Sequence, residues 1–246
     1  MENIGTIALS ALSAMRNQMA NIANNMANAD TDGFKTEHLM FDDYVVKTRG
    51  GESGLNEKIA FVSDVASFRD ISKGPLIATG NDFDLAIAQQ GYFVIEGPDG
   101  NRYTANGKLA LNEEGELITS SGAYILDEEN KVIEIDPSAT GIDVSRDGTI
   151  SVNGEQIARL QVVQFDNPQL LERVANGVYK APPSVVPQAL ENPDIIQGSV
   201  ESSNVQTILQ MTEMIEVHRA YERTSKMMSQ DHDRQLKAVD ILTRTN

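Results

Sequence analysis

Apolar residues near the start of the chain repeat at the spacing of an α-helix. Between residues 4 and 29 they recur at steps of three and four, which places them on one helical stripe: Ile4, Ala8, Ala11, Met15, Met19, Ile22, Met26 and Ala29. Asp32-Gly33 follows and can end the helix, because glycine accepts the left-handed conformation found at helix ends. The pattern predicts an N-terminal helix of roughly 39 Å.

A second helical pattern runs from about Asn204 to Leu242, where glycine and proline are absent. Ser202, Ser203 and Asn204 offer side chains for an N-cap. Its stripe consists of Met211, Ile215, His218, Tyr221, Ser225, Met228, His232, Leu236, Val239 and Leu242. A helix this long has little core of its own, so we expect it to pair with the N-terminal helix as in a coiled coil. The alternative is two unrelated surface helices.

The middle of the chain carries short apolar runs instead, as β-strands do. They lie at residues 84–88, 92–96, 117–118, 124–126, 132–135 and 160–165, and turn sequences such as Asn106-Gly107 and Asn153-Gly154 separate them. Close spacing with tight turns predicts antiparallel hairpins rather than a parallel sheet with crossover helices. We therefore expect an α+β fold, in which a discontinuous helical domain of residues 1–35 and 200–246 joins a mainly antiparallel β domain of residues 76–199.

Two further stretches read as connections. Residues 36–75 combine a glycine-rich piece at 49–54 with a short apolar run near 59–65, and we expect an extended connector there. Residues 181–193 hold four of the eight prolines, which is typical of a linker, here leading back to the C-terminal helix.

Charge is distributed unevenly along these segments. The formal net charge is −16, yet residues 1–35 carry three acids and two bases, and residues 204–246 carry six of each. The middle therefore holds −15 of the total. A uniform acidic excess repels phosphate, so nucleic acid and anionic membranes are poor partners. No run of 18 apolar residues is present to span a bilayer, and the N-terminus lacks the pattern of a secretory signal, so composition alone suggests a cytosolic protein.

Candidate catalytic and metal-binding groups are sparse. The chain has no cysteine, which excludes disulfides, thiolate metal sites and cysteine nucleophiles. His218 and His232 would lie roughly 21 Å apart on one straight helix, too far to share a metal. Asp82 and Asp84 flank Phe83 and could form an acid/base pair or hold a cation on a strand, although turn chemistry explains them more simply. We expect no cofactor and no metal, and a hydrolase using this aspartate pair is the enzymatic alternative.

The asparagine-rich end of the first helix is unusual, because asparagine is a mediocre helix former. Residues 17–28 include five asparagines, and lone surface helices would gain by exchanging them. Asparagine inside a packed helix interface can donate and accept hydrogen bonds and fix the register. The segment therefore suggests a helix that packs on several neighbours.

These residues resemble the family of flagellar rod and hook proteins. Residues 22–35, IANNMANADTDGFK, are similar to the family's N-terminal signature of ANN-x-AN followed by T-x-GFK. The SNV of residues 203–205 and the later RAYE of residues 219–222 resemble its C-terminal signature. Matches in the middle (Thr79-Gly-Asn, GYFV at 91–94) extend the resemblance over nearly the whole chain, although Ala105 and Leu109 stand where the family commonly has Arg and Phe. The start Met1-Glu-Asn, Phe41 and the length favour a proximal-rod member, with a distal-rod member as the alternative.

The resemblance implies properties that composition cannot supply. It implies a non-enzymatic subunit that is exported unfolded through the flagellar type III apparatus without a cleaved signal, assembles in the periplasm, and lines an export channel with its paired terminal helices while the β domain lies outside. Its partners would be copies of itself and other rod proteins. The expected assembly interface comprises Met15, Ile22, Ala23, Asn24, Asn25, Met26, Asn28, Gly33, Phe34, Asn204, Val205, Met211, Met214, Ile215, Arg219, Ala220, Tyr221 and Met228. A soluble adhesin or binding module is a further alternative.

Overall fold

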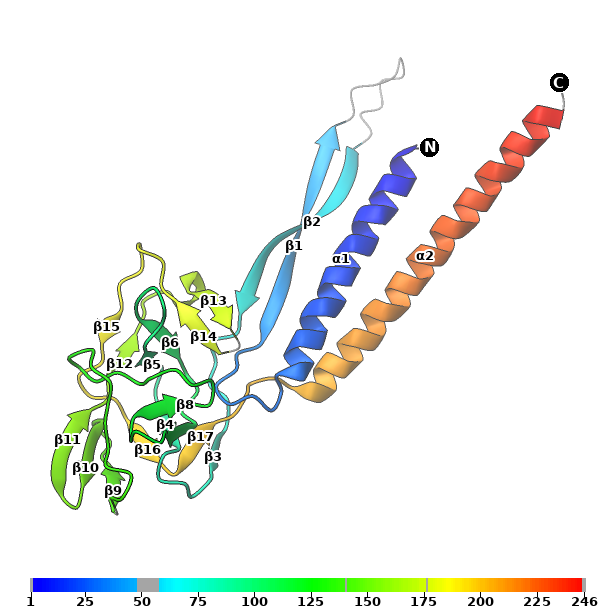
Figure 1. The fold of residues 1–246 in the computed structure, drawn as a ribbon. Helices are drawn as coiled ribbons and strands as arrows, with labels where there is room; N and C mark the ends of the chain where they lie inside the picture. Colours follow the sequence, from blue (N-terminus) through cyan, green and yellow to red (C-terminus); the bar gives the residue numbers. More distant parts are fainter. Residues whose placement is uncertain (1, 48–57, 140, 176, 245–246) are drawn as a thin grey trace. The chain divides into compact units, whose positions relative to one another are not determined.

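The computed structural model describes residues 2–47, 58–139, 141–175 and 177–244 and confirms the α+β class (Figure 1). Long helices lie at the two ends of the chain, and strands fill the part between them. The elements are α1 (Glu2–Ala27), β1 (Glu37–Lys47), β2 (Lys58–Arg69), β3 (Leu76–Ala78), β4 (Leu85–Ile87), β5 (Tyr92–Ile95), β6 (Arg102–Thr104), β7 (Leu109–Leu111), β8 (Leu117–Thr119), β9 (Ile142–Val144), β10 (Thr149–Val152), β11 (Glu155–Arg159), β12 (Val162–Gln164), the 3-10 helix η1 (Pro168–Leu170), β13 (Glu172–Ala175), β14 (Val178–Lys180), β15 (Gln188–Ala189), β16 (Ile195–Gln197), β17 (Ser199–Glu201) and α2 (Thr207–Arg244).

The chain divides into two compact units. The helical unit consists of residues 1–27, 37–68 and 206–246, and the β unit consists of residues 28–36 and 69–205. This division differs from the expected boundaries, because residues 28–35 and 200–205 group with the strands rather than with the helices. The expected connector is also divided, since residues 37–68 belong to the helical unit. The chain consequently passes between the units four times.

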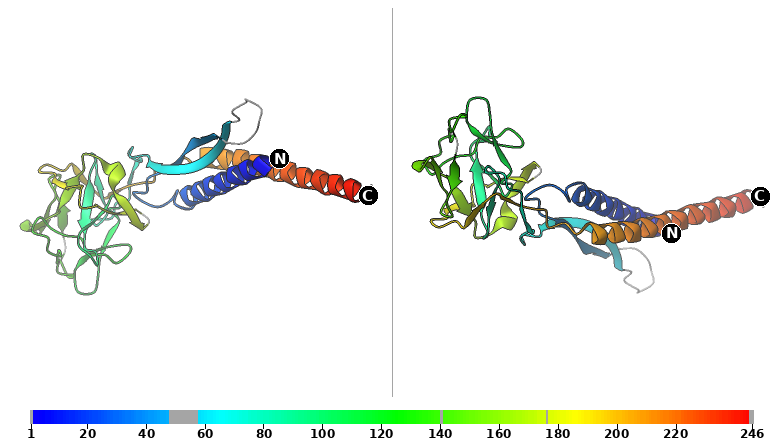
Figure 2. Two further views of the ribbon diagram at one scale, coloured as in Figure 1. Left: turned by 90° about the horizontal axis from the view of Figure 1, so that it is seen from above. Right: turned by 90° about the horizontal axis from the view of Figure 1, so that it is seen from below.

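Within the helical unit, α1 and α2 lie side by side and antiparallel (Figure 1 and Figure 2). The amide of Asn25, near the end of α1, donates to Gln210 in the first turn of α2 at 3.2 Å, and Gln18 donates to Glu213 at 3.1 Å. The later part of α2 therefore lies alongside the start of α1. At about 1.5 Å per residue, the 38 residues of α2 span about 57 Å and outrun the 26 residues of α1.

Strands β1 and β2 pair in a two-stranded sheet, and β1 contacts α1. We expected residues 36–75 to be an extended connector; most of them instead fold back on themselves and cover part of the first helix. Sequence could not reveal this pairing, because the strands show no clean alternation of apolar and polar residues. The glycine-rich piece at 49–54 lies outside the described residues.

The β unit is organised around a six-stranded sheet in the order β13-β14-β6-β5-β12-β15. Every strand pair given for it is antiparallel, as expected. Successive side chains of β5 point to opposite faces, and both faces are covered. Phe93 and Ile95 enter one apolar cluster, and Tyr92 and Val94 enter another.

Smaller sheets complete the β unit, and some expected strands are only bridges. The turn at Asn153-Gly154 joins β10 to β11, and both residues have the positive φ (52° and 86°) that a two-residue hairpin requires. The apolar runs at 124–126 and 132–135 make isolated bridges rather than full strands. The proline-rich stretch at 181–193 contributes β15 to the large sheet, so it is more than a linker.

Candidate assembly interface

The side of α2 that faces α1 follows a regular 4-3 spacing. The positions that follow this spacing are Gln210, Met214, Val217, Tyr221, Thr224, Met228 and Asp231, and Glu213 and Ala220 beside them are also half-buried. This spacing is the heptad pattern of coiled-coil seams. The expected stripe matched it at Tyr221 and Met228 but started one residue late. Met211 and Ile215, which we expected to pack on α1, are each 52% exposed on another side of the helix.

On α1 the expected stripe is largely correct. Ala8 and Ile22 are buried, and Met15 and Met26 are half-buried. The error on α2 has a simple cause. Two neighbouring positions on that helix, such as 214 and 215, are both apolar, so periodicity alone does not decide which of them turns inward. The side chains of Ile4, Val239 and Leu242 lie outside the described part of the chain.

Asn25 is the polar centre of the helical unit. Its side chain is 1% exposed, and it exchanges two hydrogen bonds with the backbone of Glu37, at 2.8 Å to the oxygen and 3.1 Å from the nitrogen. The same amide group donates to Gln210 and, at 3.4 Å, to Asn21. One asparagine therefore links α1, β1 and α2, which accounts for part of the asparagine-rich segment within a single chain.

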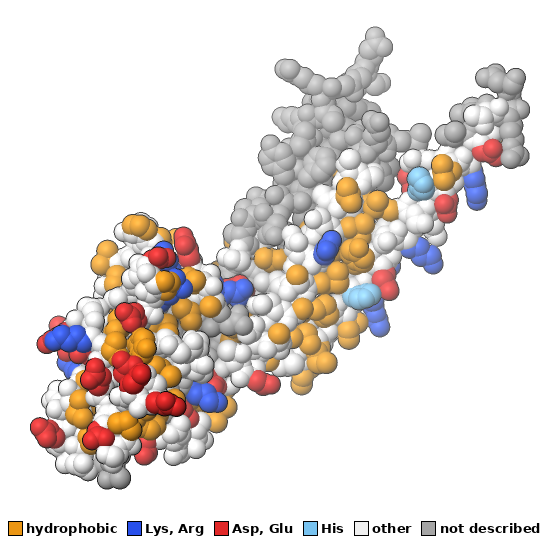
Figure 3. All heavy atoms as spheres, in the orientation of Figure 1, with side chains coloured by type: hydrophobic (Ala, Val, Ile, Leu, Met, Phe, Trp, Pro, Cys, Tyr) orange, Lys and Arg blue, Asp and Glu red, His pale blue; other side chains and the backbone are white. Residues whose placement is uncertain are grey.

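A row of aliphatic side chains remains exposed on α2. Ile208 is 79% exposed, and Met211 and Ile215 follow it at steps of three and four, so the three lie on one stripe. We call these three residues the outer row. Figure 3 shows hydrophobic side chains gathered along the two helices. Ala23 and Arg219 are also exposed, whereas Asn24 and Ala220 are half-buried.

The remaining expected interface residues lie within the β unit. Phe34 is 1% exposed, Asn28 is 5% exposed, and Gly33 is buried. Gly33 has φ +70°, and a Cβ there would lie 2.6 Å from the backbone of Ala105. The side chain of Asn204 is hydrogen-bonded to Thr36, so it is used inside the subunit rather than as the expected cap. Val205 is half-buried. Gly33, Phe34 and Asn28 thus offer no surface to a neighbouring subunit in this conformation.

The alternative aspartate site is engaged in turn chemistry. The buried carboxylate of Asp84 accepts hydrogen bonds from the hydroxyl of Thr79 at 2.6 Å and from the amide of Asn81 at 3.2 Å, whereas Asp82 is exposed. Among the described residues, no three His, Asp or Glu side chains are grouped to hold a metal ion. No helix in that part of the chain is long and apolar enough to cross a membrane.

Charge separates along the same division as the fold. The β unit carries −13 of the net −16, and the helical segments 1–27 and 206–246 each sum to zero. Red acidic side chains gather accordingly on the β unit in Figure 3. The outer row therefore belongs to a helix of zero net charge.

Three family models match this chain, and together they cover its two ends and its middle. Residues 6–35 match the model described as "Flagella basal body rod protein", and residues 196–241 match "Flagellar basal body rod FlgEFG protein C-terminal". Residues 86–152, inside the β unit, match "Flagellar hook protein FlgE/F/G D1 domain".

Similar proteins span the whole chain. The flagellar basal-body rod protein FlgF of Caulobacter vibrioides is 35% identical over 246 residues, which is 100% of both chains. FlgF of Mesorhizobium japonicum is 33% identical over 96% of each chain. The rod protein FlgG of Buchnera aphidicola subsp. Acyrthosiphon pisum is 32% identical over 91% of this chain and 93% of its own. This chain therefore belongs to the flagellar basal-body rod proteins, a family of structural subunits of the flagellum.

Proposed function

We propose that this chain is a FlgF-like subunit of the proximal rod and that it joins neighbouring subunits through its helical unit. The observation that carries the proposal is the outer row. Ile208, Met211 and Ile215 expose aliphatic surface to water on a helix that is already paired along a neighbouring side. Burying each of them against a neighbour would contribute about 1–2 kcal/mol.

Electrostatics supports the same arrangement. Closely packed copies of a strongly charged element would repel one another where water screens poorly. The neutral helices avoid this repulsion, and an outward position would let solvent and salt screen the −13 of the β unit. We therefore infer that the helical unit forms the inner layer of the rod and the β unit the outer layer.

The proposed route and location follow the family resemblance. We infer export through the flagellar type III apparatus and assembly in the periplasm, with copies of this chain and other rod proteins as partners. A position in the distal rod is the second candidate, because a FlgG relative is also similar over 91% of this chain. The two FlgF relatives match a larger share of it, at 100% and 96%.

Locating the tagged protein within isolated basal bodies tests the position directly. A deletion strain complemented with variants then tests the surface. Ala23→Glu and Ile215→Glu should abolish rod assembly and swimming, because each places a charge on an exposed part of the helices. Glu128→Lys, at an exposed turn of the β unit, is the matched control and should swim normally.

The opposite pattern would reject the inner and outer assignment. Intact rods with charges at Ala23 and Ile215, together with rods lost in Glu128→Lys, would place the contacts on the β unit. A tag found only at the hook-proximal end of the rod would favour the distal position.

A further inference from the structure

Three stretches of the β unit carry the chain to and from the helical unit, and residues from all three form one buried polar cluster. α1 ends at Ala27 and β1 begins at Glu37, so residues 28–36 connect them. Residues 69–75 follow β2, and residues 199–205 precede α2. We call these three stretches the crossing segments. All three belong to the β unit.

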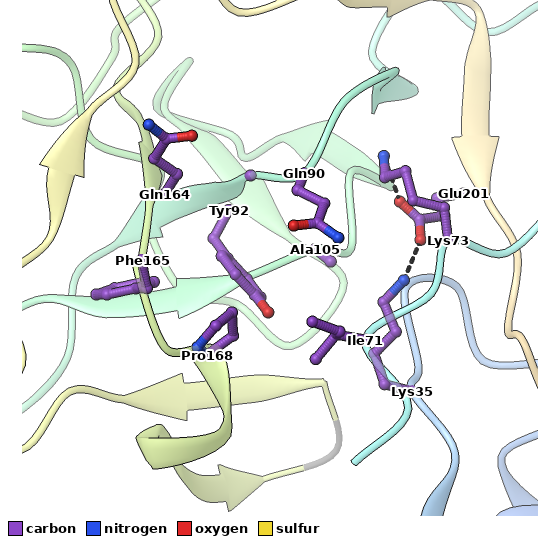
Figure 4. Close-up of a pocket in the computed structure, with 11 residues that line it drawn as sticks. Lys35, Ile71, Lys73, Gln90, Tyr92, Ala105, Gln164, Phe165, Pro168 and Glu201 are labelled. Atoms are coloured by element: carbon purple, nitrogen blue, oxygen red, sulfur yellow. Dashed lines mark hydrogen bonds and ion pairs between the residues drawn. The ribbon is translucent and has the colours of Figure 1, made fainter.

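Glu201 is the charged centre of this cluster (Figure 4). Its side chain is 3% exposed and forms ion pairs with Lys35, which is 5% exposed, and with Lys73 at 2.8 Å. One Glu201 oxygen also accepts the backbone N–H of Gly74 at 3.1 Å. The Lys35 ammonium donates to the carbonyl of Ser72 at 2.8 Å. One carboxylate thus joins a residue from each of the other two crossing segments.

Asn204 repeats the same connection with an uncharged side chain. Its oxygen accepts from both the backbone N–H and the hydroxyl of Thr36, each at 2.8 Å, and its amide donates to the carbonyls of Asp70 and Ser72, each at 3.0 Å. We call Lys35, Thr36, Lys73, Glu201 and Asn204 the clasp.

Backbone contacts reinforce the clasp. Gly33 donates to Glu201 at 2.7 Å, Asp70 donates to Thr36 at 2.8 Å, and Ser202 donates to Pro75 at 2.9 Å. The approach is so close that a Cβ on Gly74 would lie 1.9 Å from the carbonyl oxygen of Ser202. The three crossing segments are therefore closely packed and hydrogen-bonded to one another.

We propose that the clasp brings the end of α1 close to the start of α2, so that the two terminal helices no longer have to meet across a long loop of chain. Glu201 is the residue that positions the clasp. Ala27 and Thr207 are separated by about 180 residues of chain, and closing a loop of that length costs entropy. The helix pair has few buried apolar side chains to offset this cost; among the described residues they are Ala8, Ile22 and Val217. Once the clasp has joined residues 28–36 to residues 199–205, each helix meets the other at a high effective concentration.

This inference gives the family's signature residues a role inside the subunit. Lys35 is the last residue of the GFK signature, Thr36 follows it, and Asn204 belongs to SNV. Lys35 and Glu201 are 166 residues apart, so the clasp forms only when both ends of the chain are available. The two terminal helices would then pair only after the clasp has formed, whatever position the subunit takes in the rod.

Because the chain has no cysteine, cross-linking of introduced cysteines can trap the helix pair and measure the effective concentration directly. Gln18 and Glu213 are hydrogen-bonded across the helix pair, and in the full chain carrying Gln18→Cys and Glu213→Cys a short bismaleimide, which spans the gap left by the shorter side chains, should cross-link the two thiols. Adding Glu201→Gln, which changes no helix residue, should slow this reaction roughly ten-fold or more. Amide exchange in all three crossing segments should accelerate together, while exchange in β5 and β6 should not.

Lys108→Gln is the matched control. It also removes a lysine paired with a residue of the first crossing segment, but the pair of Lys108 with Asp32 is 3.7 Å long and the lysine is 60% exposed. It should leave the trapping rate unchanged. If Glu201→Gln unfolds the β unit, Lys73→Met, which removes the more exposed ammonium group, replaces it in the same comparison.

Two results would overturn the proposal. One is a variant in which amide hydrogens of the crossing segments exchange quickly while the trapping rate is unchanged. Helix pairing would then not need the clasp. The other is undiminished protection of the crossing segments in both Glu201→Gln and Lys73→Met, since Glu201 and Lys73 would then not hold them together.

Discussion

At the scale of single residues, buried polar side chains hold the chain's long-range connections. Asn25 links three elements of the helical unit, and Glu201 links three segments of the β unit. Both are almost fully buried, so their hydrogen bonds are not shared with water. Leaving a buried polar partner unsatisfied costs more than the bond itself contributes, and each residue should be sensitive even to a conservative change.

Replacing Asn25 with alanine should destabilise the helical unit by about 1–3 kcal/mol, because the backbone groups of Glu37 and the side chain of Gln210 lose their partner. Urea unfolding followed by circular dichroism at 222 nm would measure the loss. Ser13→Ala, at an exposed position on the same helix, should have a much smaller effect. Equal shifts for the two variants would show that Asn25 has no special role.

The pH dependence of the β unit's stability should reflect the ionisation of the Glu201 carboxyl group. Burial by itself would raise the pKa of this carboxyl group, but Lys35 and Lys73 outweigh it and hold the pKa below the usual 4.5. A carboxyl group with a lowered pKa in the folded state contributes stability that is fully present above its unfolded pKa and is lost as the pH falls through the folded one.

Wild type should therefore exceed Glu201→Gln in stability at neutral pH, and the difference should shrink as the pH falls below about 4.5. Unfolding of the β unit can be followed by near-ultraviolet circular dichroism of its buried tyrosines. A difference between the two proteins that stays constant from pH 7 to pH 3 would exclude an ionised Glu201 as the stabilising species.

At the scale of elements, α2 has two apolar sides with different functions. The 4-3 row that includes Val217 packs on α1, whereas the outer row lies on a neighbouring side of the helix and is exposed. Mutations on the two sides should therefore have different effects. Those on the side that packs on α1 should lower the stability of the isolated subunit, whereas those in the outer row should not.

Val217→Lys should weaken the helix pair itself, because it places a charge at a position that is 9% exposed. The isolated variant should lose helix signal at a lower temperature than wild type. Ile215→Lys should leave this transition within about 0.5 kcal/mol of wild type, as exposed substitutions usually do, yet it should fail to enter rods. Loss of helical stability in both variants would mean that the outer row also supports the subunit's own fold.

At the scale of the whole molecule, the two units differ in how they are stabilised. The β unit contains two apolar clusters, one built on Phe93 and Ile95 and the other on Tyr92, Phe165 and Tyr179. The rings of the second cluster meet edge to face, with centroids 4.8–5.8 Å apart. The helical unit has far fewer buried apolar side chains among its described residues to offset an ordering entropy of about 1–2 kcal/mol per residue.

Limited proteolysis should therefore cut the helical unit first. We expect cleavage within residues 1–27, 37–68 and 206–246, and a resistant product of residues 69–205 that keeps residues 28–36 bound through the clasp. Native mass spectrometry would detect the retained peptide. Helical segments that resist as long as residues 69–205 would contradict the unequal stability, and early loss of residues 28–36 would contradict the clasp.

The sequence by itself determined the local elements and the family. The steps of three and four at both ends specify helices, because a helix must turn one apolar stripe inward. Short apolar runs between turn sequences specify antiparallel strands, and the positive φ at Asn153 and Gly154 was foreseeable from the residue types alone. The signatures near residues 22–35 and 203–222 were sufficient to place the chain in its family.

Tertiary structure alone decided how these elements are used. Either apolar side of α2 could have faced α1, and packing selected Val217 over Ile215. Residues 37–69 could have remained a connector, and pairing made them a two-stranded sheet. Lys35 and Glu201 carry no local pattern that would join them across 166 residues. Local propensity is set by neighbours in sequence, whereas these three outcomes depend on which distant surfaces exclude water together.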